Sequence, residues 1–182
     1  GGFLVLTVKP SYLRPCEHNL LHRFPELNRV SFDGLLFEQL RAKSEEYEFP
    51  WSDLTEADSE GTNTDDWANL LHLMTEVAPN IETELMNSER PLLLVHPGLI
   101  ARYQMMPVLQ TLRDRVGHDA KCPTVWVLIA TDSQNEMPYL DGVQIPLISK
   151  GQRADVSEYW VDNLHRGRTK EITAEKTTGS GS

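Results

Sequence analysis

The sequence predicts an α/β domain built on a mostly parallel five-stranded sheet, with helices on both faces. Short hydrophobic runs alternate along the chain with helical patterns, which favours a parallel sheet with right-handed crossovers. Four of the five runs are nearly continuous in apolar residues, as in strands buried on both faces. The five runs, which are the expected strands, are residues 3–8, 29–32, 91–95, 124–130 and 143–148.

The first two expected helices follow the first two hydrophobic runs. In residues 11–24, Pro15 falls in the first turn, where a missing backbone N–H costs least. Residues 33–47 carry an apolar face, and Asp33 is the expected N-cap. The polar, acidic stretch from about residue 50 to residue 63 is assigned neither a helix nor a strand.

The strongest helical pattern spans residues 64–87. Thr64 or Asp65 can cap its N-terminus, and Pro79 is expected to kink or end the helix. Its apolar residues recur at the spacing of one helix face, at Trp67, Leu70, Leu71, Met74 and Val77.

Two more helices complete the predicted order of elements. One covers residues 107–117, with Pro107 in its first turn and Gly117 as its stop signal, and the other covers residues 154–167. We therefore expect a single domain over residues 3–167, a size that suits one hydrophobic core. Residues 168–182 are polar and end in a linker-like Gly-Ser stretch, so a disordered tail is expected.

The composition fits a globular protein without membrane spans. Hydrophobic residues make up 40% of the 182 residues and charged residues 24%. No stretch approaches the ~20 apolar residues that cross a bilayer, and the start of the chain does not have the pattern of a signal peptide. Two cysteines, Cys16 and Cys122, are too few for a disulfide framework, so reduced thiols and a cytoplasmic location are expected.

Acidic residues are concentrated in the middle of the chain. The net charge is −10, and residues 44–89 contain thirteen Asp and Glu residues but no Lys or Arg. Because nucleic-acid binding depends on positive charge, this segment argues against a direct DNA groove. It can be a solvated acidic surface, or it can dock a basic partner or mimic DNA.

The loop after the first expected strand lacks the residues that hold phosphate. Ligands bind at the carboxyl ends of parallel strands, and a phosphate cradle there needs glycines so that backbone N–H groups can approach the ligand. The stretch TVKPSYLRP contains no glycine, and Lys9 and Ser11 alone cannot form an anion site. Phosphate binding of the usual kind is therefore excluded, and no cofactor is expected.

Polar residues after three other strands are the remaining candidates at this edge. His96 follows the third strand and can be a general base or a residue that caps a loop. Thr131 and Asp132 follow the fourth strand, where they can contact a phosphate or cap a turn. Arg153, near the start of the last helix, can reach an anion or stay on the surface.

Two further groups of residues have alternative interpretations. His18 and His22 lie four apart on one helix, a zinc-binding spacing, but no third ligand is evident and no metal site is assigned. Arg102 and Tyr103, with Met105 and Met106, would suit a protein interface, although the two methionines can equally belong to the core.

The order of elements resembles a P-loop ATPase of the AAA type in a degenerate, Rossmann-like three-layer form. LLLVHP stands where the Walker B strand would be and IATD where the first sensor would be, while the Walker A loop is missing. A second resemblance rests on the strings FLVLTVKP, DWANLLHL, LLLVHPGLIARYQMM, LRDRVG, YLDGVQIPLIS and LHRG. They resemble the C-terminal domain of the large serine/threonine kinase, or a related large ATPase subunit, of BREX and phage-growth-limitation systems.

This second resemblance implies a domain of a bacterial phage-defence complex. Kinase motifs are absent from the chain, because it has no Gly-rich loop, H-R-D or D-F-G. The expected function is therefore non-catalytic assembly or regulation through contacts with other subunits of the complex. The alternatives are a divergent domain that binds or hydrolyses ATP with magnesium, and an acidic module that mimics DNA.

Overall fold

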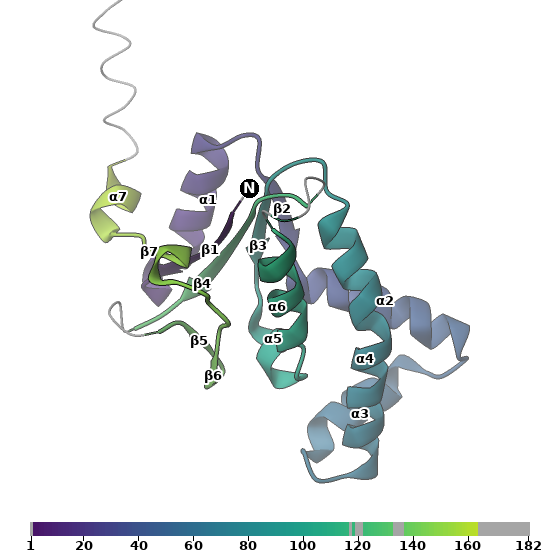
Figure 1. Cartoon of the computed structure of the whole chain (residues 1–182). Coiled ribbons are helices and arrows are strands. Elements are labelled where there is room, and N and C mark those ends of the chain that lie inside the picture. The colour runs from purple at the N-terminus through teal and green to yellow at the C-terminus, as the bar shows by residue number, and fades with distance from the viewer. Residues whose placement is uncertain (1, 117, 119–121, 133–136, 164–182) are drawn as a thin grey trace, which may run out of the picture.

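The computed structural model describes residues 2–116, 118, 122–132 and 137–163 (Figure 1). The sheet-forming part begins with β1 (Phe3–Val8), η1 (Pro10–Tyr12), α1 (Leu13–Arg23) and β2 (Asn28–Ser31). Three helices follow, α2 (Phe32–Glu46), α3 (Trp51–Glu60) and α4 (Asp65–Met86). The remaining elements are β3 (Leu92–Val95), α5 (Gly98–Arg102), α6 (Met106–Arg115), β4 (Val125–Ala130), β5 (Tyr139–Leu140), β6 (Val143–Gln144), η2 (Lys150–Gln152), β7 (Arg153–Asp155) and α7 (Glu158–Asp162).

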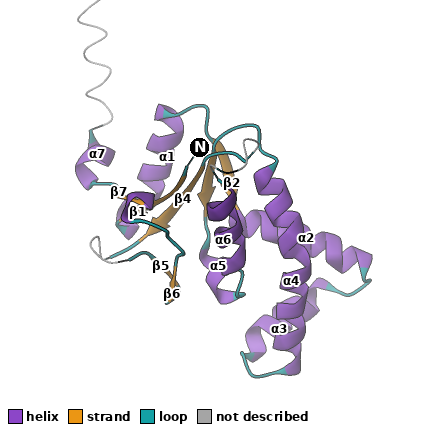
Figure 2. Cartoon of the chain, in the orientation of Figure 1, coloured by secondary structure: helices purple, strands orange, loops and turns teal. Residues whose placement is uncertain are grey.

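Five of the strands form one parallel sheet, which confirms the predicted α/β class. Their order is β2-β3-β4-β1-β7, and every neighbouring pair is parallel (Figure 2). The register pairs Phe3 with Val125 and Val8 with Ala130, so β1 and β4 end at the same level. The strands β5 and β6 form a separate antiparallel pair.

Helices cover both faces of this sheet, as the near-continuous apolar runs predict. Alternate strand residues such as Val5 and Leu94 pack with α2, α4, α5 and α6, whereas Leu6 and Leu93 pack with α1 and α7. In β3 all four side chains are buried, because both faces of this strand are covered. The result is a three-layer arrangement of the Rossmann-like kind.

Hydroxyl side chains cap the N-termini of α2 and α4. The Thr64 side chain accepts a hydrogen bond from the Trp67 backbone N–H at 3.1 Å, which confirms Thr64 as the cap of α4. In α2 the cap is Ser31, whose Oγ accepts from the Gly34 N–H at 3.3 Å. The prediction of Asp33 as cap was wrong, because α2 begins at Phe32, which the sequence pattern had placed in the strand.

The assignment of no helix to the acidic stretch was also wrong. Residues 51–60 form helix α3, whose Leu54 and Ala57 pack beside α4, while the Trp51 ring contacts Phe37 of α2 edge to face. Of the two alternatives for Pro79, an end of the helix is wrong, since α4 continues to Met86. The buried side chains on either side of the proline hold this second half of the helix in place.

The fifth strand of the sheet lies later in the chain than predicted. Residues 143–148 do not join the sheet: two of them form β6, and Ile145 is buried while Ile148 is 70% exposed. The edge position is taken by β7, which pairs with β1 from Val5 to Thr7. Only the backbone of β7 is needed for this pairing, so its polar sequence is compatible with an edge strand.

The last predicted helix begins later than expected. The helix α7 starts at Glu158 and is capped by Ser157, whose side chain accepts from the Trp160 N–H. The expected tail at residues 168–182 lies outside the described residues. None of the helices in the described part of the chain has the length and apolar character needed to cross a membrane.

Candidate functional site

A pocket of about 410 Å³ lies at the carboxyl ends of β3 and β4, where open parallel sheets bind ligands. Its apolar walls come from the ends of these strands, from α1 and from the β5–β6 hairpin. Its polar lining residues are Glu17, Asp33, His96, Tyr139 and Asp141. We call this cavity the edge pocket.

His96 is the one predicted site residue that lines the edge pocket. Its backbone φ of 50° is unusual for a residue other than glycine. Its Nδ1 lies 3.2 Å from Ser31 Oγ, and its carbonyl accepts from the Asp33 N–H at 3.3 Å. Ser31 Oγ already caps α2, and no carboxylate of the described residues is hydrogen-bonded to the His96 ring. Within this part of the chain, the pair therefore lacks the orienting group of a nucleophilic triad.

The electrostatics of the edge pocket disfavour a phosphate. Glu17, Asp33 and Asp141 line it, and no Lys or Arg stands among the lining residues that the structure describes. Glu17 pairs with Arg29 at 2.5 Å. Burial raises the pKa of Asp33, while a hydrogen bond from the Leu99 N–H and the nearby His96 partly oppose this shift. The pocket is therefore suited to neutral or cationic groups.

Thr131 and Asp132 follow β4 but do not line the edge pocket. The Thr131 N–H donates to the Val8 carbonyl at 2.8 Å and so extends the pairing of β4 with β1. Asp132 is exposed. Of these three residues that follow strand ends, His96 lines the edge pocket and the other two do not.

The basic residues near β1 are bound by acidic side chains. Arg153 lies in β7 rather than in the last helix, and its guanidinium contacts Asp155 at 2.7 Å. The Thr7 hydroxyl, which is fully buried, donates to the same carboxylate. Lys9 forms an ion pair with Glu158, which raises the pKa of Lys9. Neither cation points to a phosphate site.

Arg102 and Tyr103 bind Asp58 of α3, far along the chain from both. Arg102 lies 2.7 Å from Asp58 Oδ1, and the Tyr103 hydroxyl donates to the same oxygen at 3.0 Å. The Arg102 guanidinium also stacks over the Trp67 ring at 5.5 Å. Burial, followed by Asp58, raises the pKa of Tyr103. This Asp58 cluster joins α3 to α4 and α5.

The prediction of an exposed interface at Arg102, Tyr103, Met105 and Met106 was wrong for three of these residues. Tyr103, Met105 and Met106 are 8%, 3% and 8% exposed and belong to the core. For the two methionines, this was the alternative prediction. The short helices α5 and α6 turn these side chains toward α4. Arg102 alone of the four remains exposed.

The histidine pair on α1 gains no further ligand. His18 and His22 lie on the outer part of this helix, where neither side chain is buried. Within the described residues, no group of three or more His, Cys, Asp or Glu side chains is arranged to hold a metal ion.

A second concavity, of about 520 Å³, lies between α3 and α4 and is closed at one side by the end of α2. We call it the helical groove. Figure 1 shows α3 at the end of the α2–α4 pair that is farther from the sheet. The sequence shows that residues 44–89 are acidic, but it did not predict the groove, because α3 was not predicted.

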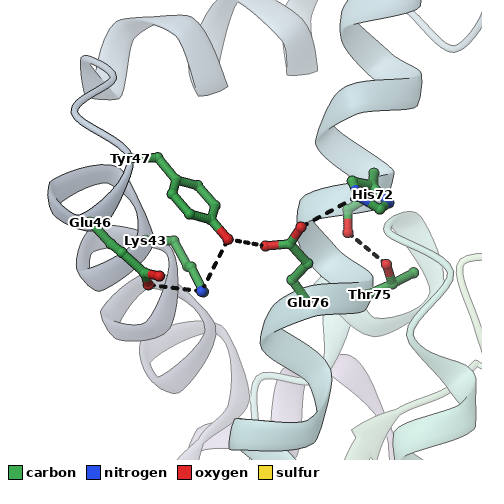
Figure 3. A network of polar contacts seen from close by, with 6 residues as sticks. All are labelled: Lys43, Glu46, Tyr47, His72, Thr75 and Glu76. Carbon is green, nitrogen blue, oxygen red and sulfur yellow. Dashed lines mark hydrogen bonds and ion pairs between the residues drawn. The ribbon is translucent and has the colours of Figure 1, made fainter.

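A polar network joins the C-terminal end of α2 to α4 at one side of the groove (Figure 3). The Tyr47 hydroxyl, at the end of α2, donates to Glu76 of α4 at 2.8 Å. Glu76 also lies 3.3 Å from His72 Nε2 one helical turn earlier. Lys43 contacts Glu46 at 2.8 Å and the Tyr47 hydroxyl at 3.4 Å, and both contacts raise the pKa of Lys43.

Comparison with known proteins adds no identification. The chain matches no protein-family model, no curated protein and no solved structure.

Proposed function

We propose that this chain is a non-catalytic assembly or regulatory domain of a bacterial antiphage defence protein, and that it acts in the cytoplasm through contacts with other protein subunits. Its resemblance to the large kinase of BREX-type systems supports the assignment to a defence protein. The observation that supports the non-catalytic role is the lining of the edge pocket: among the described residues, three carboxylates and no Lys or Arg surround the usual ligand position of a parallel sheet.

The order of elements, on which the resemblance to a P-loop ATPase rests, supports a degenerate P-loop origin for the sheet. In a nucleotide-hydrolysing domain, the turn after the first strand supplies backbone N–H groups to phosphate. Here the turn contains Pro10 in place of glycine and leads into η1, and the nearby Lys9 is held by Glu158. A triphosphate would meet carboxylates and would displace an existing ion pair.

One observation favours a second function, the binding of a small ligand. The edge pocket has the position and size of a ligand site, and the backbone of both His96 and Asp141 has a positive φ at its border. A divergent nucleotide-binding domain would use this pocket for a base or sugar. Its acidic lining favours an uncharged or cationic group over a phosphate.

Two measurements on the purified protein test these proposals. The first is a thermal shift with ATP, ADP and GTP, each with and without magnesium. A ligand that binds only the folded state stabilises it by about 2.7 kcal/mol at a hundredfold excess over its Kd. For a protein of this size, 1 kcal/mol corresponds to about 2–4 °C, so that stabilisation raises Tm by about 5–11 °C. We expect no magnesium-dependent shift, and such a shift would refute the non-catalytic proposal.

The second measurement tests assembly directly. The chain is co-expressed with each other protein of its host's defence gene cluster, and the purified mixture is analysed by size exclusion with light scattering. We expect a stable complex of defined mass with at least one of these proteins. Elution of the chain by itself in every mixture would contradict an assembly role.

A further inference from the structure

We propose that the helical groove binds a basic, amphipathic helix of a partner protein. This inference rests on the assembly role proposed above and names the surface and the chemistry through which assembly occurs.

The floor of the groove is apolar, although the helices around it are strongly acidic. Leu54 of α3 is half-buried, and Phe49 lies beside it in the turn before α3. The rest of the floor comes from Ala57, Leu70 and Leu73, which keep 3–8% of their surface exposed. A partner's apolar side chains would remove this surface, and their own, from water. Tyr47, 49% exposed at the rim, adds an aromatic contact of the type enriched in interfaces.

Among the described residues, the rim of the groove carries five carboxylates and no Lys or Arg. They are Asp53, Glu56 and Glu60 of α3 and Asp66 and Glu76 of α4. Glu56 and Glu60 are one helical turn apart and therefore repel each other. Glu60 also lies at the C-terminal end of α3, where a negative charge opposes the helix dipole and where no basic residue compensates it. Cationic side chains on an occupant would relieve both effects.

The walls of the groove select a helical occupant. Extended peptides gain affinity mainly by pairing with an exposed sheet edge. The walls here are two helices whose backbone groups are already hydrogen-bonded within each helix, so an extended strand would find no main-chain partners. A helix satisfies its own backbone and can place apolar anchors at i, i+3 or i+4, and i+7 on the floor. Lys and Arg beside this stripe then face the acidic rim.

The probe for the experiment is a fluorescent synthetic peptide with a leucine stripe at helical spacing and Lys or Arg on both sides of it. A scrambled peptide of identical composition keeps the charge but loses the apolar face. Binding is measured by fluorescence anisotropy at low and at moderate salt, because contacts between exposed charges weaken as salt increases.

Two matched protein variants locate the binding surface. The groove variant carries Glu56→Gln and Glu60→Gln, both exposed on α3. The control variant carries Glu38→Gln and Glu89→Gln, which remove the same two charges from exposed positions outside the groove. The groove substitutions remove repulsion within α3, so a loss of binding cannot be attributed to unfolding, and thermal denaturation of each variant verifies this.

We expect the amphipathic peptide to bind the wild-type protein and the control variant alike, and to bind the groove variant on the order of three- to tenfold more weakly. The scrambled peptide should bind far more weakly than the amphipathic one. Equal binding to both variants, equal binding of both peptides, or no saturable binding up to about 1 mM would each overturn the proposal.

Failure of this inference is distinguishable from failure of the assembly role. If a complex with a defence-cluster protein forms equally well with the wild-type chain and with the groove variant, the assembly role stands and the groove is not its surface. If no such protein forms a complex, the assembly role itself fails, whatever the peptide result.

Discussion

Replacement of Asp58 by alanine is expected to loosen α3 from the rest of the protein. The Tyr103 hydroxyl would lose its acceptor in a position where the residue is only 8% exposed, and an unpaired buried hydroxyl costs about 1–3 kcal/mol. The Arg102 pair adds little, about 0–1 kcal/mol, because its two side chains are 41% and 35% exposed. The free energy of unfolding should therefore fall by about 1–3 kcal/mol.

Urea denaturation, followed by circular dichroism, measures this change. The decisive comparison is a double-mutant cycle with Tyr103→Phe, which removes the hydroxyl that Asp58 accepts from. In the background of the Tyr103→Phe variant, the Asp58 substitution should cost only the Arg102 contribution. Asp58→Asn, which keeps an acceptor oxygen, should be milder than Asp58→Ala. If Asp58→Ala costs the same in both backgrounds, the hydrogen bond to Tyr103 is not what anchors α3.

Three further predictions follow from single contacts. Pro79→Ala should raise the free energy of unfolding in urea by about 1–3 kcal/mol, because it restores an N–H inside α4; an unchanged value would mean that the helix has adapted to the proline. Burial, and secondarily Glu17, raises the pKa of Cys16 from its ordinary 9.0 to about 11, because the folded state favours the neutral thiol. The contribution of this residue to the free energy of unfolding is therefore fully present below pH 9 and is lost between pH 9 and pH 11, by up to about 1.4 kcal/mol per pH unit. Urea titrations across this range should show that component in the wild type and not in Cys16→Val. Asn19→Ala should cost about 1–3 kcal/mol, because the Val161 carbonyl loses the buried donor that lies 2.7 Å away; a smaller loss in thermal denaturation would show that this contact does not hold α7.

The sheet was predictable where its strands are buried on both faces. Residues 92–95 and 125–130 read as continuous apolar runs because helices cover both sides of them, and this property is local to the sequence. The edge strand β7 gives no such signal. It is the sequence Arg-Ala-Asp, and it joins the sheet because β1 offers an open edge to its backbone. The apolar run at residues 143–148 misled the prediction because Ile145 is buried from a loop rather than from a strand.

The sequence predicted where the candidate site lies, but of the residues that line it the sequence predicted only His96 as a site residue. The rule that ligands bind at the carboxyl ends of parallel strands directed attention to His96, which does line the edge pocket. Asp33 and Asp141 reach the same pocket from α2 and from the β5–β6 turn, and their approach depends on how these elements pack. Arg102 and Tyr103 were predicted to be functional candidates. Their partner Asp58 was not, because it lies in α3, a helix that the acidic sequence did not predict.

The weak packing of α3 is itself an argument about its role. Fixing the backbone of each residue costs about 1–2 kcal/mol, and most helices offset this cost by burying an apolar face. Over its 10 residues α3 buries only Ala57, has no side-chain N-cap, and carries acids at its C-terminal end. Besides the partly buried Leu54 and Trp51, the Asp58 cluster holds it in position. Its small contribution to the core, together with its place as one wall of the helical groove, supports the proposal that the groove binds a partner helix. A basic helix seated there would supply the missing packing and the missing positive charge together, so α3 should gain the most protection from hydrogen exchange when the partner binds.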